Sequence, residues 1–151
     1  MVNGFSVDIE EWFHICGVDG PLAFDRWPSL PSRVVETTRR LLDLLARHDV
    51  RATFFILGWV AERYPGLVRE IVARGHEPAC HSYWHRLIYK LDREEFAADT
   101  RRAKDVIEQA AGESVFGYRA PSYSITMQSL WALAHPATLS GRCLRSTQLD
   151  G

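Results

Sequence analysis

The sequence predicts an α/β fold with parallel strands, because short β-prone apolar segments alternate with amphipathic helical segments along the chain. The chain has 151 residues, of which 46% are hydrophobic and 25% are charged. This length predicts one domain that can bury a core of ordinary size. The alternation by itself is typical both of a barrel and of a doubly wound sheet.

Composition excludes several classes of protein. The 18 basic and 19 acidic residues give a net charge of -1, whereas a nucleic-acid-binding surface is strongly basic, so we expect no nucleic-acid partner. No apolar run approaches about 18 residues, so no membrane span is expected. The acidic N-terminus is not typical of a secretory signal, which predicts a cytoplasmic chain. Cys16, Cys80 and Cys143 are widely spaced and odd in number, so we interpret them as small buried side chains rather than a disulfide framework.

The first half of the chain supplies two expected strands and a helix between them. Residues 4–8 form the first strand, and a loop rich in glycine and proline follows over residues 14–32. Apolar residues recur at helical spacing over residues 33–47, and Ser32 is the expected N-cap of that helix. Residues 50–57 are a continuous apolar run, typical of a buried parallel strand.

A second helix and a third strand come next. The helix is expected over residues 59–74, interrupted or restarted at Pro65, with Gly75 in the position of a C-terminal glycine. Residues 76–80 form the third expected strand. The chain therefore repeats the order strand, helix, strand that parallel sheets require.

The last expected elements are a long helix, a strand and a short helix. Asp92 predicts the start of the long helix, which runs through about residue 111 and ends at Gly112. Residues 114–118 form the fourth expected strand, and residues 126–133 form the final helix.

Reactive side chains follow three of the expected strands, and in parallel α/β folds the carboxyl ends of strands form the edge where active sites assemble. Asp8 and Glu10 are two positions apart on a strand, so they point to one face while Ile9 turns into the core. One carboxylate of such a pair can bind a metal while its neighbour acts as a base. A solvated acidic strand end is the alternative.

Two histidines follow the third expected strand. His81 and His85 are four positions apart, so they share one face of a helical turn and can reach a single ion. Imidazole nitrogen suits zinc, cobalt, nickel and iron. With a carboxylate from another strand end, the pair makes a two-histidine, one-carboxylate site with open positions for water and substrate. Ordinary hydrogen bonds at a helix start are the alternative.

Arg119 follows the fourth expected strand and can fix a carboxylate through two parallel hydrogen bonds. The backbone N–H after Pro121 can donate to a developing oxyanion. A surface salt bridge is the alternative for the arginine. His14 can line the same pocket or serve a structural role.

Together, these motifs resemble the polysaccharide deacetylases of carbohydrate esterase family 4. The segments FSVDIEEWFH, RATFFILGWVAERYP, GHEPACHSYWHRL and GYRAPSYSIT are most similar to the subfamily found at bacterial exopolysaccharide loci with PEP-CTERM/exosortase systems. The resemblance extends from about residue 3 to residue 133. It implies a distorted (β/α) barrel of the polysaccharide deacetylase type, of which this chain supplies an incomplete N-terminal half.

The resemblance also implies a reaction, namely metal-dependent hydrolysis of N-acetyl groups on a polysaccharide or oligosaccharide. Asp8 matches the general base, and Arg119 matches the arginine that orients it. The divalent metal is expected to be zinc, with cobalt, nickel or iron as alternatives. Glu11 is an alternative ligand that the two-residue strand period disfavours. The residues that match the metal ligands are Glu10, His81 and His85.

Three further residues are expected to bind substrate. The N–H of Ser122 matches the oxyanion donor, and Tyr123 stands one position later than the family's usual aromatic residue. His14 is the third. Because the motifs depart from the commonest family form, the exact sugar is left open.

The end of the chain does not match the family. Residues 134–151 have neither helical nor strand periodicity, and no Leu-x-His motif, which carries the family's general acid, follows residue 133. We therefore expect a partial deacetylase domain over residues 1–133 and an irregular tail, translated from a shifted reading frame, over residues 134–151. On that expectation the chain deacetylates weakly or not at all, and an inactive carbohydrate- or metal-binding fragment is the alternative.

Overall fold

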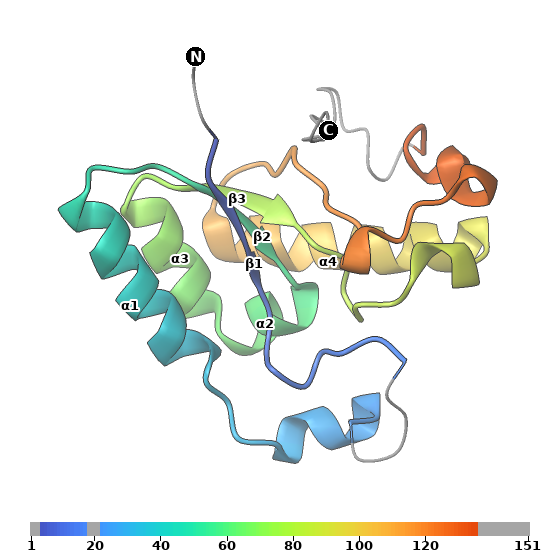
Figure 1. Ribbon diagram of the computed structural model, residues 1–151, viewed down its shortest axis with the longest axis horizontal. Coiled ribbons are helices and arrows are strands. Elements are labelled where there is room, and N and C mark those ends of the chain that lie inside the picture. The colour runs from blue at the N-terminus through green and yellow to red at the C-terminus, as the bar shows by residue number, and fades with distance from the viewer. Residues whose placement is uncertain (1–3, 18–21, 136–151) are drawn as a thin grey trace.

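The structure is a computed structural model that describes residues 4–17 and 22–135. Within them, three parallel strands form one sheet in the order β1-β2-β3, as Figure 1 shows. The predicted α/β fold with parallel strands is therefore confirmed. Most of the proposed tail, and Cys143, lie outside the described residues. The strands are β1 (Ser6–Ile9), β2 (Thr53–Ile56) and β3 (Glu77–Cys80).

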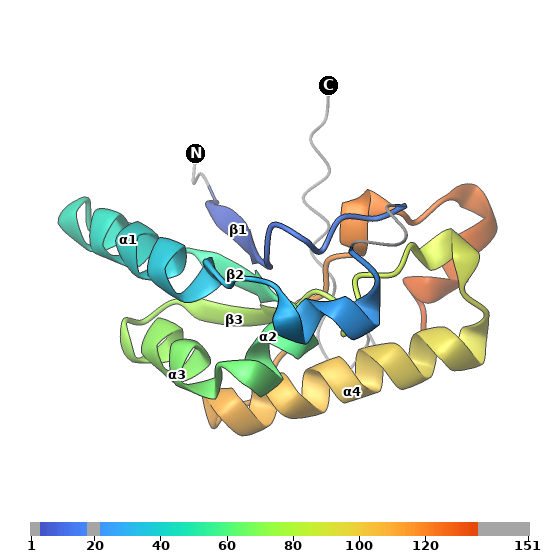
Figure 2. The same ribbon diagram turned by 90° about the horizontal axis from the view of Figure 1, so that it is seen from below.

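Helices connect the strands. Helix α1 (Val34–Arg47) leads from β1 to β2, and α2 (Gly58–Arg63) and α3 (Pro65–Ala73) lead from β2 to β3. Helix α4 (Arg93–Ala111) follows β3, packs against that strand and crosses α2 and α3, as Figure 2 shows from below. Within the described parts of the chain, no helix has both the length and the apolar character that a membrane span needs.

The two faces of the sheet are unequally covered. On β2, Phe54 and Ile56 are completely buried and belong to the main hydrophobic core together with helix residues such as Leu42 and Ile71. The alternate side chain, Phe55, is half-buried on the other face. The covered face stabilises the sheet, whereas the open face and its carboxyl edge are accessible to polar groups.

Local signals predicted both ends of α4 and the break between α2 and α3. Asp92 forms a capping box with Glu95 at the start of α4, and Gly112 ends the helix in the left-handed conformation, at φ 74°. Pro65 separates α2 from α3, as expected from a residue that cannot continue a helix. These boundaries are confirmed because each depends on contacts between near neighbours in the sequence.

The fourth predicted strand, residues 114–118, is wrong. It is reduced to a single parallel bridge between Tyr118 and Cys80. The N–H of Val115 donates to the side chain of Glu108 at 2.8 Å, which ties the start of this segment to α4 instead of to the sheet.

Several segments that were expected to be loops, or a helix of unspecified type, are 3-10 helices. The helix predicted over residues 126–133 is a 3-10 helix, and its start is fixed by a capping box between Thr126 and Ser129. Another 3-10 helix lies inside the loop predicted over residues 14–32. The 3-10 helices are Phe24–Ser29, Ile88–Lys90, Pro121–Tyr123 and Met127–Ala132.

Candidate metal and catalytic site

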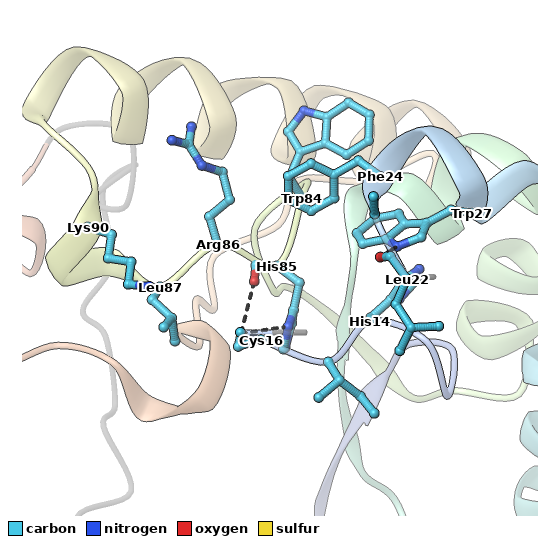
Figure 3. A pocket seen from close by; sticks show the side chains of 13 residues that line it. His14, Cys16, Leu22, Phe24, Trp27, Trp84, His85, Arg86, Leu87 and Lys90 are labelled. Atoms are coloured by element: carbon cyan, nitrogen blue, oxygen red, sulfur yellow. Dashed lines mark hydrogen bonds between the residues drawn. The ribbon is translucent and has the colours of Figure 1, made fainter. Parts of the chain in front are cut away.

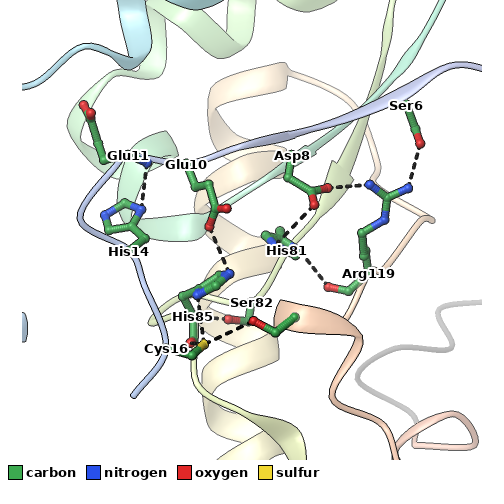
Figure 4. Close-up of polar contacts among 11 residues, drawn as sticks. Ser6, Asp8, Glu10, Glu11, His14, Cys16, His81, Ser82, His85 and Arg119 are labelled. Carbon is green, nitrogen blue, oxygen red and sulfur yellow. Dashed lines mark hydrogen bonds and ion pairs between the residues drawn. The ribbon is translucent and has the colours of Figure 1, made fainter. Parts of the chain in front are cut away.

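Side chains from the carboxyl ends of β1 and β3 converge at the open edge of the sheet (Figure 4). Glu10 directly follows β1, and His81 directly follows β3. Together with His85 they offer ligand atoms that all lie within 4.8 Å of one another. Both histidines are buried, with 1% and 8% of their surface exposed, so the cluster is fixed by the surrounding protein.

Glu11, the alternative ligand, has a different task. Its carboxylate is buried and accepts hydrogen bonds from the N–H groups of Arg33 (3.0 Å) and Val34 (3.2 Å), at the start of α1. The hydroxyl of Ser32 also donates to it. The prediction that Ser32 caps this helix is therefore wrong, because the carboxylate of Glu11 satisfies the free N–H groups instead.

The donor atoms of the cluster fit a divalent metal. Oε2 of Glu10 lies 2.9 Å from Nε2 of His85. That oxygen is buried, and no group in the described residues meets it in hydrogen-bonding geometry. Such a buried carboxylate oxygen needs a cation beside it, which is either a protonated His85 or a metal ion. A carboxylate oxygen and two imidazole nitrogens are a set that catalytic zinc sites use, so the residues of the cluster fit a divalent cation.

Hydrogen bonds orient both imidazoles. Nδ1 of His81 lies 2.9 Å from the backbone oxygen of Arg119, and only a protonated Nδ1 can donate there, which leaves Nε2 free to bind a metal. Nδ1 of His85 lies 3.2 Å from Sγ of Cys16, whose thiol also donates to the backbone oxygen of His85 at 3.2 Å. The interpretation of Cys16 as a buried apolar side chain is wrong, because it is half-buried and contacts His85. Cys80 is buried as expected.

The charges of these groups differ. Burial lowers the pKa of His81, although the carboxylate of Asp8 opposes this effect. Burial also lowers the pKa of His85, but the contacts with Cys16 and Glu10 outweigh it and raise that pKa to about 9. Without a metal, His85 therefore carries a proton at neutral pH and pairs with Glu10.

The loop between the histidines is not the helical turn that was predicted. Ser82 and His85 have φ values of 62° and 54°, in the left-handed region that non-glycine residues rarely adopt. Asp99 on α4 holds this conformation, because its carboxylate accepts from the N–H groups of Tyr83 (2.8 Å) and Trp84 (3.1 Å). The imidazoles thus reach one point through a loop fixed by a distant helix.

Asp8 and Arg119 form a second unit beside the cluster. Oδ1 of Asp8 lies 2.5 Å from Nη1 of Arg119, and Nη2 of the arginine donates to the hydroxyl of Ser6 at 2.6 Å. The guanidinium also lies 4.0 Å from the ring centre of Phe55. Oδ2 of Asp8 lies 3.9 Å from Nε2 of His81. One carboxylate oxygen is thus held by the arginine while the other faces the histidines.

The expected substrate-binding residues lie at different depths. Ser122 is near the cluster, because its hydroxyl lies 3.5 Å from Sγ of Cys16. Tyr123 is 75% exposed, and its ring centre lies 5.7 Å from Cζ of Arg119. His14 is only 2% exposed, and its Nδ1 accepts from the N–H of Glu11 at 3.0 Å. Burial, and next the charges of His85 and His81, lower the pKa of His14 to about 3.

A pocket of about 520 Å³ opens beside the cluster (Figure 3). His14 and His85 line it on the side of the cluster, and Phe24, Trp27 and Trp84 line it with aromatic rings. The pocket therefore adjoins the candidate metal ligands directly.

Sequence reasoning missed two residues of this site. Asp99 is the one carboxylate among the buried residues of α4, three positions after Phe96 and four before Ala103, and that placement was a usable signal. Cys16 gave no comparable signal, because its contact with His85 joins positions 69 residues apart.

The chain is similar to known proteins over most of its length. The sequence model of the polysaccharide deacetylase family matches residues 21–137. Peptidoglycan-N-acetylglucosamine deacetylase from Bacillus cereus is 34% identical over 112 residues, which are 74% of this chain and 39% of that protein. Chitooligosaccharide deacetylase from Sinorhizobium fredii is 40% identical over 85 residues, 56% of this chain and 40% of that protein. The chain thus spans about two fifths of the length of these curated relatives.

A solved structure of this family has a similar fold. The family 4 carbohydrate esterase from Streptomyces lividans, in complex with acetate, superposes with a TM-score of 0.67 at 26% sequence identity. The match covers 90% of this chain and 58% of that one.

Proposed function

Because the chain belongs to the polysaccharide deacetylase family, carbohydrate esterase family 4, we propose that it hydrolyses N-acetyl groups on a glycan. The observation that carries this proposal is the convergence of Glu10, His81 and His85 beside a carboxylate, Asp8, that an arginine holds in place. Three ligands from the protein leave coordination positions for water and substrate.

Glu10, His81 and His85 would hold a divalent metal, zinc in the first place, which would supply Lewis acidity toward the acetyl carbonyl and toward water. Cobalt, nickel and iron are the alternatives that the same ligands accept. The roles proposed for the remaining groups are those that the family resemblance implies, and the contact between Arg119 and Asp8 supports them.

Asp8 is the general base. Arg119 occupies its Oδ1, so Oδ2 is the oxygen that takes a proton from the attacking water. The backbone N–H of Ser122 donates to the oxygen of the tetrahedral intermediate. Ser122 has φ 50°, and this left-handed conformation fixes the direction of the surrounding peptide groups. As the C–N bond breaks, the proton that Asp8 took from water passes to the leaving nitrogen, so that acetate is released and an amine remains on the sugar.

The substrate class follows from the relatives. The two curated relatives reported above are named for peptidoglycan N-acetylglucosamine and for chitooligosaccharides, so we propose a glycan that contains N-acetylglucosamine. The motif resemblance to exopolysaccharide-locus deacetylases makes a bacterial exopolysaccharide our specific proposal. The proposed reading-frame shift in residues 134–151 is tested separately by translating the coding DNA in its other frames.

The test combines metal analysis with an activity assay. The purified chain is loaded with zinc, and acetate release is measured with N-acetylglucosamine oligomers. We expect weak acetate release that chelation abolishes and that Asp8→Asn lowers by about 100-fold or more, since general bases contribute at least that factor. Bound metal without any acetate release contradicts the proposal and favours the alternative of a binding fragment.

A further inference from the structure

The pocket beside the metal ligands has an aromatic wall. The ring centres of Phe24 and Trp84 lie 5.3 Å apart, and each lies within 6 Å of Trp27, at 4.9 Å and 5.8 Å. Trp27 is buried behind them, whereas 47% of Phe24 is exposed. Aromatic faces carry partial negative charge and attract the polarised C–H groups on the face of a pyranose ring. The wall thus suits a sugar.

The opposite side of the pocket carries positive charge. Arg86 and Lys90 line it, as Figure 3 shows. Arg86 forms an exposed ion pair with Glu95 at 2.9 Å. Lys90 is exposed, and no acidic group of the described residues lies within ion-pair distance of it. The lining residues include no carboxylate among those that the structure describes, so the pocket is electrostatically suited to an anion.

We infer that this pocket is a subsite for an acidic sugar residue, a hexuronic acid, next to the N-acetylated residue that reacts. The inference rests on the proposed function, because it places the neighbouring residue of the same glycan. His85 lines the pocket and also belongs to the metal-ligand cluster, so the two sugars occupy adjoining positions. The ring of the acidic sugar packs on Phe24 and Trp84, and its carboxylate faces Lys90, because Arg86 is already paired with Glu95.

The volume of the pocket is compatible with this occupant. About 520 Å³ lies within the range of about 300–1,000 Å³ that small-molecule sites usually have. Aromatic side chains with a few polar groups at fixed positions are also typical of such sites. The pocket therefore provides both shape and charge selection for one sugar ring.

Binding to metal-free protein tests the subsite without any requirement for turnover. Calorimetry compares a hyaluronan tetrasaccharide, in which glucuronic acid alternates with N-acetylglucosamine, with neutral chitotetraose. We expect the acidic ligand to bind about fivefold more tightly, which is the upper range for one exposed ion pair. Lys90→Gln should remove this preference, whereas Phe24→Ala should weaken both ligands.

Arg69→Gln is the matched control, since Arg69 is an exposed cation on α3 that does not line the pocket. It removes the same charge and should leave both affinities unchanged. The subsite is overturned if the two ligands bind equally or if neither binds measurably. It is also overturned if Arg69→Gln and Lys90→Gln change the affinity for the acidic ligand equally. A preserved acidic preference in a chain that releases no acetate supports the subsite and contradicts the proposed function instead.

Discussion

Asp99 should control both the stability of the chain and its affinity for metal. It projects from α4 and is only 7% exposed, and its two oxygens accept from the N–H groups of Tyr83 and Trp84. Those residues lie between His81 and His85. Asp99→Asn keeps the size of the side chain but replaces one acceptor with an NH₂ group, which cannot accept a hydrogen bond.

The expected magnitude follows from these two bonds. A hydrogen bond to a charged group contributes about 1.5–3 kcal/mol, and a buried N–H left without a partner costs about 1–3 kcal/mol. Asp99→Asn should therefore lower the free energy of unfolding by about 2 kcal/mol, and Asp99→Ala by about 3–6 kcal/mol. The loss of groups that orient metal ligands typically weakens metal affinity about 10–100-fold. We expect that range for zinc binding to Asp99→Asn.

Urea unfolding and zinc titration against a chelator of known affinity measure the two effects separately. Asp105→Asn is the control, because Asp105 is an exposed residue on the same helix. It should leave both quantities near those of the parent chain. If Asp99→Asn loses stability but folded protein keeps the parent zinc affinity, Asp99 does not position the ligand loop.

Three other changes test the charges at the site. His14→Gln should flatten the acid dependence of stability. The pKa of His14 is about 3 in the folded protein, whereas its ordinary value is 6.5. The contribution of His14 to the free energy of unfolding is therefore complete above pH 6.5 and is lost as the pH falls toward 3. In urea unfolding of metal-free protein, the free energy of unfolding should fall between pH 6.5 and 5 by about 2 kcal/mol more in the parent than in the variant. Parallel pH curves for the two proteins would contradict this prediction. The pKa of His85, about 9, predicts that apparent cobalt affinity rises about tenfold per pH unit from pH 7 to 9, since the proton and the metal compete for Nε2. A flat chelator-competition profile would rule that out. Arg119→Met should lower kcat, because Asp8 loses its partner. Cobalt affinity should stay within about threefold of the parent value, because the backbone oxygen that accepts from His81 is kept. Equal losses of kcat and of cobalt affinity would show that Arg119 does not act on Asp8 alone.

The parts of the fold that the sequence predicted are those that local contacts determine. The capping box at Asp92 and the left-handed Gly112 lie at the ends of α4, and each signal sits within four residues of the boundary it fixes. The alternation of strands and helices then brings Asp8 and His81 to one edge, because parallel strands end on the same side. Topology, rather than any single motif, made the candidate site predictable.

The remaining parts depend on contacts between distant positions. The left-handed loop after β3 is held by Asp99, 16 residues from Tyr83, and no property of residues 81–85 alone reveals it. Likewise, the contact between Cys16 and His85 joins two loops that the sequence separates by 69 positions. Such tertiary contacts override local propensity, which favoured a helical turn for the histidines.

The acidic run after β1 shows how one strand period assigns opposite tasks to neighbouring carboxylates. Side chains at adjacent positions point to opposite sides, so Glu10 faces the histidines while Glu11 faces α1. Glu11 accepts from the first N–H groups of that helix, where the helix dipole favours negative charge. The same backbone segment therefore anchors α1 and presents Glu10 to the site. A solvated acidic strand end has neither contact, and this is why the run is better explained as part of a site.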